Sequence, residues 1–344
     1  MAEGAKTATG ETRSPRHGLR QVKAAGPACL ACLFGLFAAL PLATSLGVDP
    51  FYLVIATRIM IFGIAALSLD FILGYGAMVS FGHAAFIGIG AYAVGIAASH
   101  GINDFLLQLL FAMAAAAAFG VVTGLISLRT KGVYFIMITL AFGQMAYFLM
   151  VSLSAYGGDD GLTLKTRSTL FGQAWLENDL FFYYLVLALL LTCFLLTQAA
   201  TASRFGRVLR GTRDNAERMN AIGFDPFPYQ LTAYVIAGML AATAGTLLAN
   251  QAEFVSPAYM TWQRSGELIM MVVVGGMGTL TGGILGAAVF LLLEEFLSSF
   301  SQYWKLGLGI ILVLIVLHGK GGIHGMFVNM HGMLVNLFSG RDRR

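Results

Sequence analysis

A serine and a histidine stand three residues apart in the apolar stretch GYGAMVSFGHAAFIGIGAY, residues 74–92. Ser80 and His83 are the residue types that act as nucleophile and general base in hydrolases. Such a pair also needs an oriented base and an oxyanion hole, and neither a third triad member nor a GxSxG motif occurs nearby. We therefore interpret His83 as a hydrogen-bonded packing residue, and an intramembrane hydrolase is the weaker alternative.

Other patterns that could carry chemistry are equally weak. Cys29 and Cys32 form a CxxC motif, which can bind zinc or take part in redox reactions, but they lie in an apolar run typical of a lipid-embedded helix. No HExxH metal motif occurs, and Gly319-Lys320-Gly321 lacks the loop and the hydroxyl of a GxxxxGK[ST] phosphate-binding loop. The chain is therefore predicted to be no enzyme and to bind no metal or cofactor, so any ATP is bound by another polypeptide.

Composition places these residues in a membrane protein. The 344 residues are 58% hydrophobic and 11% charged, whereas soluble domains carry about 25% charged residues. A helix of about 20 apolar residues spans the hydrocarbon core. Continuous apolar runs, without the alternation of a barrel strand, occur near residues 27–47, 51–73, 79–99, 105–128, 132–153, 181–198, 229–250, 265–276, 282–299 and 303–318. The predicted fold class is an all-α polytopic transmembrane helix bundle of about ten segments, forming one transmembrane domain over residues 27–318.

The distribution of positive charge orients this bundle. Most of the 21 lysines and arginines fall in the tail 1–26, the link 129–131, the loop 199–228 and the tail 319–344. If the chain crosses the membrane ten times, these four regions lie on the same side. The positive-inside rule identifies that side as the cytoplasm. Both termini are therefore predicted to be cytoplasmic, and the net charge of +4 reports topology rather than nucleic-acid binding. An apolar stripe over residues 322–338 is typical of an interfacial helix in the C-terminal tail.

Two glycine-rich stretches interrupt the apolar runs. GYG at 74–76 is expected to end one helix, and the next helix then presents a small-residue face made of Ser80, Ala84, Gly88, Ala91 and Gly95. GGMGTLTGGILG at 275–286 follows a segment too short to span alone. Broken helices commonly line the substrate path of transporters. The two stretches therefore predict a solute pathway, with close packing alone as the alternative; the candidate pathway residues are Asp70, Tyr75, Ser80, Gly82, His83, Gly275, Gly276 and Gly278.

Ionisable residues within the apolar segments are scattered: Arg58, Asp70, His83, Glu267, Glu294 and Glu295. An arginine or aspartate at a helix centre costs about 2.5–3.5 kcal/mol, so each should face the protein interior or an interface. We interpret Glu267 and the Glu294–Glu295 pair as solvated residues near outer helix ends. The scatter provides no proton relay, which argues against a stand-alone ion-coupled secondary transporter or channel.

The internal loop at 201–228 is basic and is predicted to be helical in its middle. One apolar stripe recurs at helical spacing: Val208, Thr212, Ala216, Met219 and Ile222. Asp214 with Arg218, and Arg213 with Glu217, are spaced as i,i+4 pairs. Gly223 is placed to end the helix, and Pro226 and Pro228 are expected to stop it from resuming.

Taken together, these residues resemble the LivM-type permease subunit of bacterial branched-chain amino acid ABC importers. The similarity runs from about residue 52 to residue 318. The family signature G-Y-x-G-x-x-S-x-G-H-A-A-F-x-G-I-G-A-Y fits at Gly74, Tyr75, Ser80, Gly82, His83, Ala84, Ala85, Phe86, Gly88, Gly90 and Tyr92. Further ordered matches are YFIMITLAFGQM at 134–145, GGDDGL at 157–162, FVSPAY at 254–259 and VVVGGMGTLTGGILGA at 272–287.

The resemblance implies a five-component importer in the bacterial inner membrane. This chain would pair with a homologous second permease to form the path for branched-chain amino acids or a similar small polar solute. Two cytoplasmic ATP-binding subunits would hydrolyse ATP, and a periplasmic binding protein would deliver the substrate. The loop around 207–223 would be the coupling helix that docks on an ATPase subunit, with the candidate residues Arg210, Arg213, Asp214, Glu217, Arg218, Met219 and Gly223.

The sequence departs from the family pattern at three sites, one of them a pair of residues. Asp70 stands where the family commonly has Asn, Ala77-Met78 where it has a Gly-Gln pair, and Gln144 where it has Glu. All three lie beside the expected pathway. Systems related to this family move urea, short amides or aromatic acids, and the resemblance leaves these as alternative substrates.

Overall fold

The computed structural model describes residues 33–41, 49, 51–300, 302–318, 322, 323 and 325, and most of these are helical. The tail 1–26 and nearly all of the tail 319–344, with its predicted interfacial helix, lie outside the described residues. Residues 33–41 form a helix within the first predicted segment. The other α-helices are α2 (Phe51–Gly76), α3 (His83–Ser99), α4 (Phe105–Ser127), α5 (Val133–Ser152), α6 (Asp179–Ala202), α7 (Arg204–Asp214), α8 (Ala216–Ala221), α9 (Pro226–Ala252), α10 (Trp262–Gly275), α11 (Leu280–Ser298) and α12 (Trp304–His318). Short elements complete the chain: η1 (Ser154–Tyr156), β1 (Leu162–Thr163), η2 (Trp175–Glu177), β2 (Phe254–Val255) and η3 (Pro257–Met260).

Within the described residues, six helices are long and apolar enough to cross a membrane: α2, α4, α5, α6, α9 and α11. The apolar helices α3 and α12 are shorter, and α10 has 14 residues. The chain is therefore a multi-pass membrane protein built as an all-α helix bundle, as predicted. The count of about ten segments and the cytoplasmic termini stay predictions.

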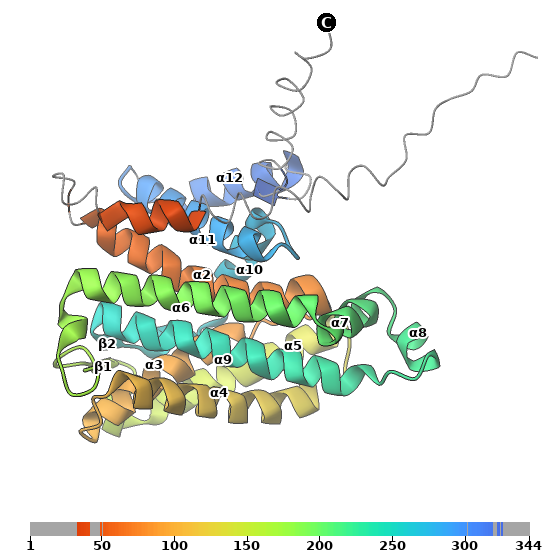
Figure 1. Cartoon of the computed structure of the whole chain (residues 1–344), viewed down its shortest axis with the longest axis horizontal. Helices are drawn as coiled ribbons and strands as arrows, with labels where there is room; N and C mark the ends of the chain where they lie inside the picture. Colours follow the sequence, from red (N-terminus) through yellow and green to blue (C-terminus); the bar gives the residue numbers. More distant parts are fainter. Residues whose placement is uncertain are drawn as a thin grey trace, which may run out of the picture.

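Helices α2 and α9 form the centre of this bundle. In the apolar spans of α2 and α9, 78% and 72% of the residues are buried, against 28% for α4 and 22% for α5. Glycines bring α3 and α9 into close contact. A Cβ at Gly90 of α3 would overlap the backbone of Ala242, and a Cβ at Gly245 of α9 would overlap the carbonyl oxygen of Ile87. Helix α9 also contacts α4 and α2, and α6 runs beside α2 (Figure 1).

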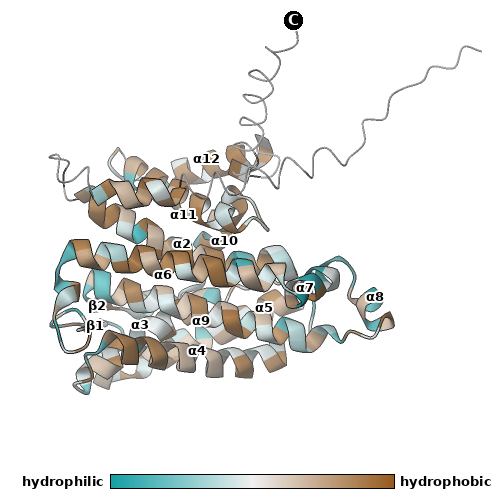
Figure 2. Cartoon of the chain, viewed as in Figure 1, coloured by the Kyte–Doolittle hydropathy of each residue, from teal (hydrophilic) through white to brown (hydrophobic). Residues whose placement is uncertain are grey.

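The two ends of the bundle differ in structure. At one end, β1 pairs antiparallel with β2, and Arg167 forms ion pairs with Asp179 at 2.6 Å and with Glu253 at 3.2 Å. These contacts hold the loop between α5 and α6 over the ends of α6 and α9. Helices α7 and α8 project at the opposite end (Figure 1). Figure 2 shows hydrophilic residues gathered on α7 and α8, whereas the spanning helices are largely hydrophobic. We call the end of the bundle that carries β1 and β2 the β end, and the opposite end the α7–α8 end.

The first glycine-rich break lies later in the chain than predicted. Helix α2 continues through GYG and ends at Gly76, and residues 77–82 form the non-helical link, in which Ala77 has φ +53°. Ser80 therefore lies in the link and not on the predicted small-residue face of α3. Two other members of that face pack against short elements, Gly88 against Met260 of η3 and Gly95 against Leu162 of β1. The close contact between α3 and α9 is made instead by the neighbouring face of α3, which carries Gly90.

The internal loop forms two helices instead of one. Asn215 has extended backbone angles between α7 and α8, and its side chain caps α8 by accepting a hydrogen bond from the N–H of Arg218. The predicted pair of Asp214 with Arg218 is therefore interrupted, and Asp214 instead lies 3.4 Å from Arg213. Gly223, with φ +90°, follows the end of α8, as predicted. The expectation for the prolines is wrong: Pro226 starts α9, because proline is tolerated in the first turn of a helix.

Candidate functional site

The two glycine-rich stretches touch each other in the folded chain. Asp70 of α2 accepts a hydrogen bond through Oδ1 from the backbone N–H of Gly278, at 2.7 Å. One turn further along α2, a Cβ at Gly74 would overlap the backbone of Gly278. Asp70 is fully buried, and its Oδ2 has no hydrogen-bond partner among the described residues. The structure thus brings two of the candidate pathway residues, Asp70 and Gly278, into direct contact.

Gly275, Gly276 and Gly278 shape the hairpin between α10 and α11. Gly276 and Gly278 have φ of +114° and +75°, in the region that glycine adopts without steric cost. Gly275 serves close packing, because a Cβ there would overlap the carbonyl oxygen of Gly282 in α11. The short helix α10 is therefore one arm of a tight helical hairpin whose turn lies against α2.

His83 joins the start of α3 to the middle of α2. The imidazole is fully buried, and its Nε2 lies 2.8 Å from the hydroxyl oxygen of Ser68. Its ring also packs against Phe86, with 5.7 Å between the ring centroids. The prediction of a hydrogen-bonded packing residue at the break is confirmed. Ser80 lies elsewhere, beside Tyr234 of α9, so Ser80 and His83 do not form a nucleophile–base pair.

The link before α3 is held by α5 and α10. Gly82 packs against α5, because a Cβ there would overlap the carbonyl oxygen of Thr139, and the Thr139 hydroxyl accepts a hydrogen bond from the N–H of Phe81 at 3.3 Å. Ser265 of α10 accepts a hydrogen bond from the N–H of Ala84 at 3.0 Å. Non-helical backbone at membrane depth must be covered and satisfied by protein. These contacts supply that cover for the start of α3.

Two arginines of α7 contact the end of α2 that carries the GYG sequence. Arg213 donates a hydrogen bond from Nη1 to the carbonyl oxygen of Gly74. The guanidinium carbon of Arg210 lies 5.8 Å from the ring centroid of Tyr75, within the range of a cation–π interaction. Arg210 also donates to the carbonyl oxygen of Thr201 at the end of α6, at 3.0 Å. Helix α7 is therefore attached to the membrane helices through its basic side chains.

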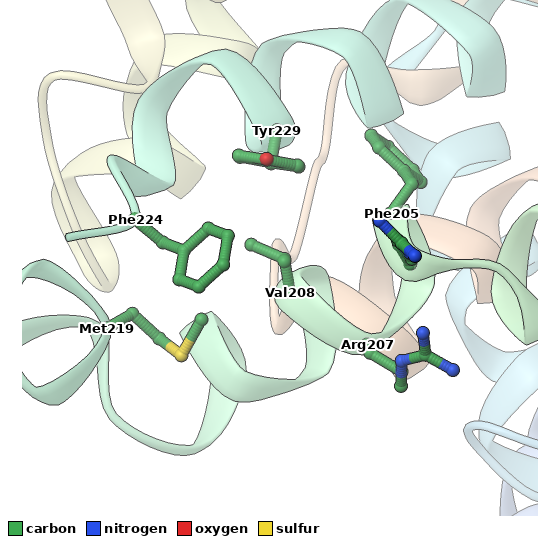
Figure 3. Close-up of a pocket in the computed structure, with 7 residues that line it drawn as sticks. Phe205, Arg207, Val208, Met219, Phe224 and Tyr229 are labelled. Carbon is green, nitrogen blue, oxygen red and sulfur yellow. The ribbon is translucent and has the colours of Figure 1, made fainter. Parts of the chain in front are cut away.

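Helix α8 stands apart from the bundle. None of its residues is buried, and Glu217 and Arg218 are exposed. Its contact with α7 is made by Met219, which lies where a Cβ at Gly211 would be. Figure 3 shows Met219 and Phe224 facing Val208 and Tyr229 around a pocket; the pocket has a volume of about 570 Å³ and is also lined by Arg204, Phe205 and Arg207.

The candidate residues therefore form two groups. Asp70, Tyr75, Gly278, Arg210 and Arg213 meet at the α7–α8 end of α2, whereas Ser80, Gly82 and His83 lie beside α5, α9 and the middle of α2. The sequence did not reveal the residues that complete these contacts, namely Ser68, Thr139, Ser265 and the carbonyl of Gly74. Their spacing along the chain carries no signal, because each belongs to a different element from its partner. Among the described residues, no group of His, Cys, Asp and Glu side chains could hold a metal ion.

Residues 51–317 match the family described as the permease component of branched-chain amino acid transport systems. The chain belongs to this family. This permease is similar to the high-affinity branched-chain amino acid transport system permease protein LivM of Salmonella typhimurium, with 28% identity over 292 residues, 78% of this chain and 69% of the relative. The LivM protein of Escherichia coli K12 is 29% identical over the same shares of the two chains. A probable LivM protein of Methanocaldococcus jannaschii is 25% identical over 72% of this chain and 81% of the relative.

No solved structure matches this permease significantly. Family membership makes the chain a transport subunit rather than an enzyme. The family match begins at the first residue of α2 and ends within α12, so it includes both glycine-rich stretches and the α7–α8 loop.

Proposed function

We propose that this permease is the transmembrane subunit of an ATP-driven ABC importer for branched-chain amino acids in a bacterial inner membrane. It pairs with a second, homologous permease, receives substrate from a periplasmic binding protein and is driven by two cytoplasmic ATP-binding subunits, which hold the ATP. Family membership over residues 51–317 supports this proposal. In this topology the α7–α8 end faces the cytoplasm and the β end faces the periplasm.

The α7–α8 loop provides the coupling element of the proposal. The exposed helix α8, with Glu217 and Arg218, is the part that an ATPase subunit can reach. Helix α7 then transmits the movement inwards, because Arg213 contacts Gly74, and Gly74 packs against Gly278. This chain of contacts leads from the cytoplasmic surface to the turn between α10 and α11. It is the single observation on which the coupling mechanism rests.

Replacing Arg213 tests this mechanism. In Arg213→Ala, closure of the ATPase pair would no longer pull on α2, so we expect ATP hydrolysis to continue while leucine uptake falls about tenfold or more, the effect of losing one charge-assisted hydrogen bond. Uptake and hydrolysis are measured in proteoliposomes that contain the purified five-component system. Arg129→Ala is the matched control, because Arg129 is an exposed arginine in the α4–α5 link. Uptake by Arg213→Ala at the wild-type rate would contradict the mechanism.

The same preparation tests the importer itself. We expect both ATPase subunits and the second permease to co-purify with a tagged chain, and uptake to require ATP. A stand-alone secondary transporter would instead take up leucine in vesicles that contain this chain only, driven by an ion gradient. That result would overturn the proposed function.

A further inference from the structure

The ionisable residues that are scattered along the sequence gather at the β end of the bundle. Arg58 lies in α2, Arg264 and Glu267 in α10, and Glu294 in α11. Glu294 is attracted by Arg58 and Arg264 and repelled by Glu267 and its neighbour Glu295, and Tyr259 of η3 interacts electrostatically with both arginines. Each charged residue lies within about 10 Å of the helix end nearest to β2, from the rise of 1.5 Å per residue. We call Arg58, Arg264, Glu267 and Glu294 the charged cluster.

Only two of the four residues in the charged cluster form an ion pair with each other. Arg264 and Glu267 form an ion pair at 2.6 Å. Within the described residues, Arg58 and Glu294 take part in no ion pair. The guanidinium of Arg58 instead lies over the ring of Phe62, 5.9 Å from the centroid. Arg58 and Glu294 lie on neighbouring helices and attract each other electrostatically without forming a direct ion pair, so each charge can still take a second, external partner.

Helix α10 has an accessible face, which carries Glu267 of the charged cluster. Gln263, Glu267 and Met270 recur at helical spacing on the accessible side of α10, opposite the buried Ser265, Leu268 and Met271. Gly266 lies within this face, and a Cβ at that position would meet nothing within 4 Å. Charged side chains within a spanning segment are costly in contact with lipid and normally face water or protein. The accessible face of α10 is therefore suited to an aqueous path rather than to lipid.

Resting on the function proposed above, we infer that Arg58 and Glu294 bind the charged head group of a zwitterionic amino acid as it enters the permease. Arg58 contacts the α-carboxylate and Glu294 the α-ammonium group. Two opposite charges held on different helices match a zwitterion, whereas a neutral amide or urea offers neither side chain an opposite charge. Gly266 leaves room on the open face for the apolar side chain of the substrate.

Two neutral variants test the head-group contacts. In the assembled importer in proteoliposomes, we expect Arg58→Gln and Glu294→Gln each to lower leucine uptake about ten- to a hundredfold, the effect of losing a hydrogen bond to a charged group. The second permease and the ATPase subunits must still co-purify. Uptake at the wild-type rate in either variant would overturn the site, and so would loss of the second permease, which would make the cluster a contact between subunits. If the wild-type importer itself takes up no leucine, the proposed function fails instead.

Gly266 provides a test that leaves the charges intact. Gly266→Leu should fold, because the position opens on empty space, yet block uptake. The matched control is Gly309→Leu in α12, where a Cβ would also meet nothing within 4 Å. Equal uptake by the two variants would overturn the site.

Chemical labelling gives a readout that does not depend on transport. In a background with Cys29, Cys32 and Cys193 replaced by alanine, we expect Gly266→Cys to react with a membrane-impermeant thiol reagent and Gly309→Cys not to react. Adding leucine with the binding protein should slow the labelling of Gly266→Cys. Failure of Gly266→Cys to react, or equal labelling with and without leucine, would overturn the site.

Discussion

Asp70 is a buried carboxylate with a clear structural role. One oxygen of its carboxylate accepts the hydrogen bond from the N–H of Gly278. An asparagine side chain presents an oxygen with the same reach. We therefore expect this contact to need an acceptor and not a charge.

A pair of substitutions separates the acceptor from the charge. We expect Asp70→Asn to keep wild-type uptake and thermal stability, because the side-chain oxygen still meets Gly278. Asp70→Leu should lower the free energy of unfolding by about 1–3 kcal/mol, because it leaves a buried N–H without its partner. Thermal unfolding of the purified permease in detergent measures both changes. A loss of stability in Asp70→Asn as large as in Asp70→Leu would show that the charge itself is required.

For His83, the sequence predicted a packing role but not the residue that His83 contacts. Its apolar surroundings and the lack of a triad partner predicted a packing role, and its contact with Ser68 confirms that role. Ser68 stands 15 residues away in the sequence and could not be chosen as the partner. Whether α2 presents Ser68, or one of its neighbours, to α3 depends on how the two helices are rotated against each other.

At the scale of elements, the glycines have two separate uses. Gly276 and Gly278 make a turn that requires positive φ. Gly74, Gly90 and Gly245 instead allow two backbones to approach. In a bilayer, where lipid tails are as apolar as the helices, such van der Waals contact is a main source of helix association.

Helix contact through Gly245 can be tested with a single added methyl group. In Gly245→Ala the new Cβ would meet the carbonyl oxygen of Ile87, which belongs to backbone and cannot rotate away. We expect the free energy of unfolding to fall by about 1–3 kcal/mol, the usual cost of overpacking. Gly309→Ala, in open space, should leave stability unchanged or raise it slightly, since alanine favours helix. Equal changes in the thermal unfolding of Gly245→Ala and Gly309→Ala would show that the α3–α9 contact contributes no stability.

At the scale of the whole molecule, the β end and the α7–α8 end must face opposite sides of the membrane. From the positive-inside rule we expect the basic α7–α8 end to face the cytoplasm. The charged cluster and helices α7 and α8 then lie at opposite ends of the bundle. This separation agrees with the proposal that substrate binds at one end and an ATPase subunit at the other.

Two exposed positions can test this orientation. In a chain without native cysteines, Gln173→Cys lies at the β end and Asn220→Cys in α8, and both positions are exposed. We expect a membrane-impermeant thiol reagent to label Gln173→Cys in intact spheroplasts and to label Asn220→Cys only after permeabilisation. The opposite pattern would place both predicted termini outside the cytoplasm.

The sequence by itself determined the class of this protein and the approximate course of its helices. Long apolar runs must be helical in lipid, because every backbone N–H and C=O has to be paired within the segment. Clusters of glycine marked the places where helices end or touch. These inferences are local, since each depends only on residues within one or two helical turns.

Only the tertiary structure decided which residues meet. Gly278 lies 208 residues from Asp70, and Arg213 lies 139 residues from Gly74, yet both pairs form at the end of α2. The same packing gathers Arg58 and Glu294, which looked unrelated in the sequence. Such contacts depend on the rotation and depth of each helix against its neighbours, and these are set by the packing of the whole bundle rather than by any one segment.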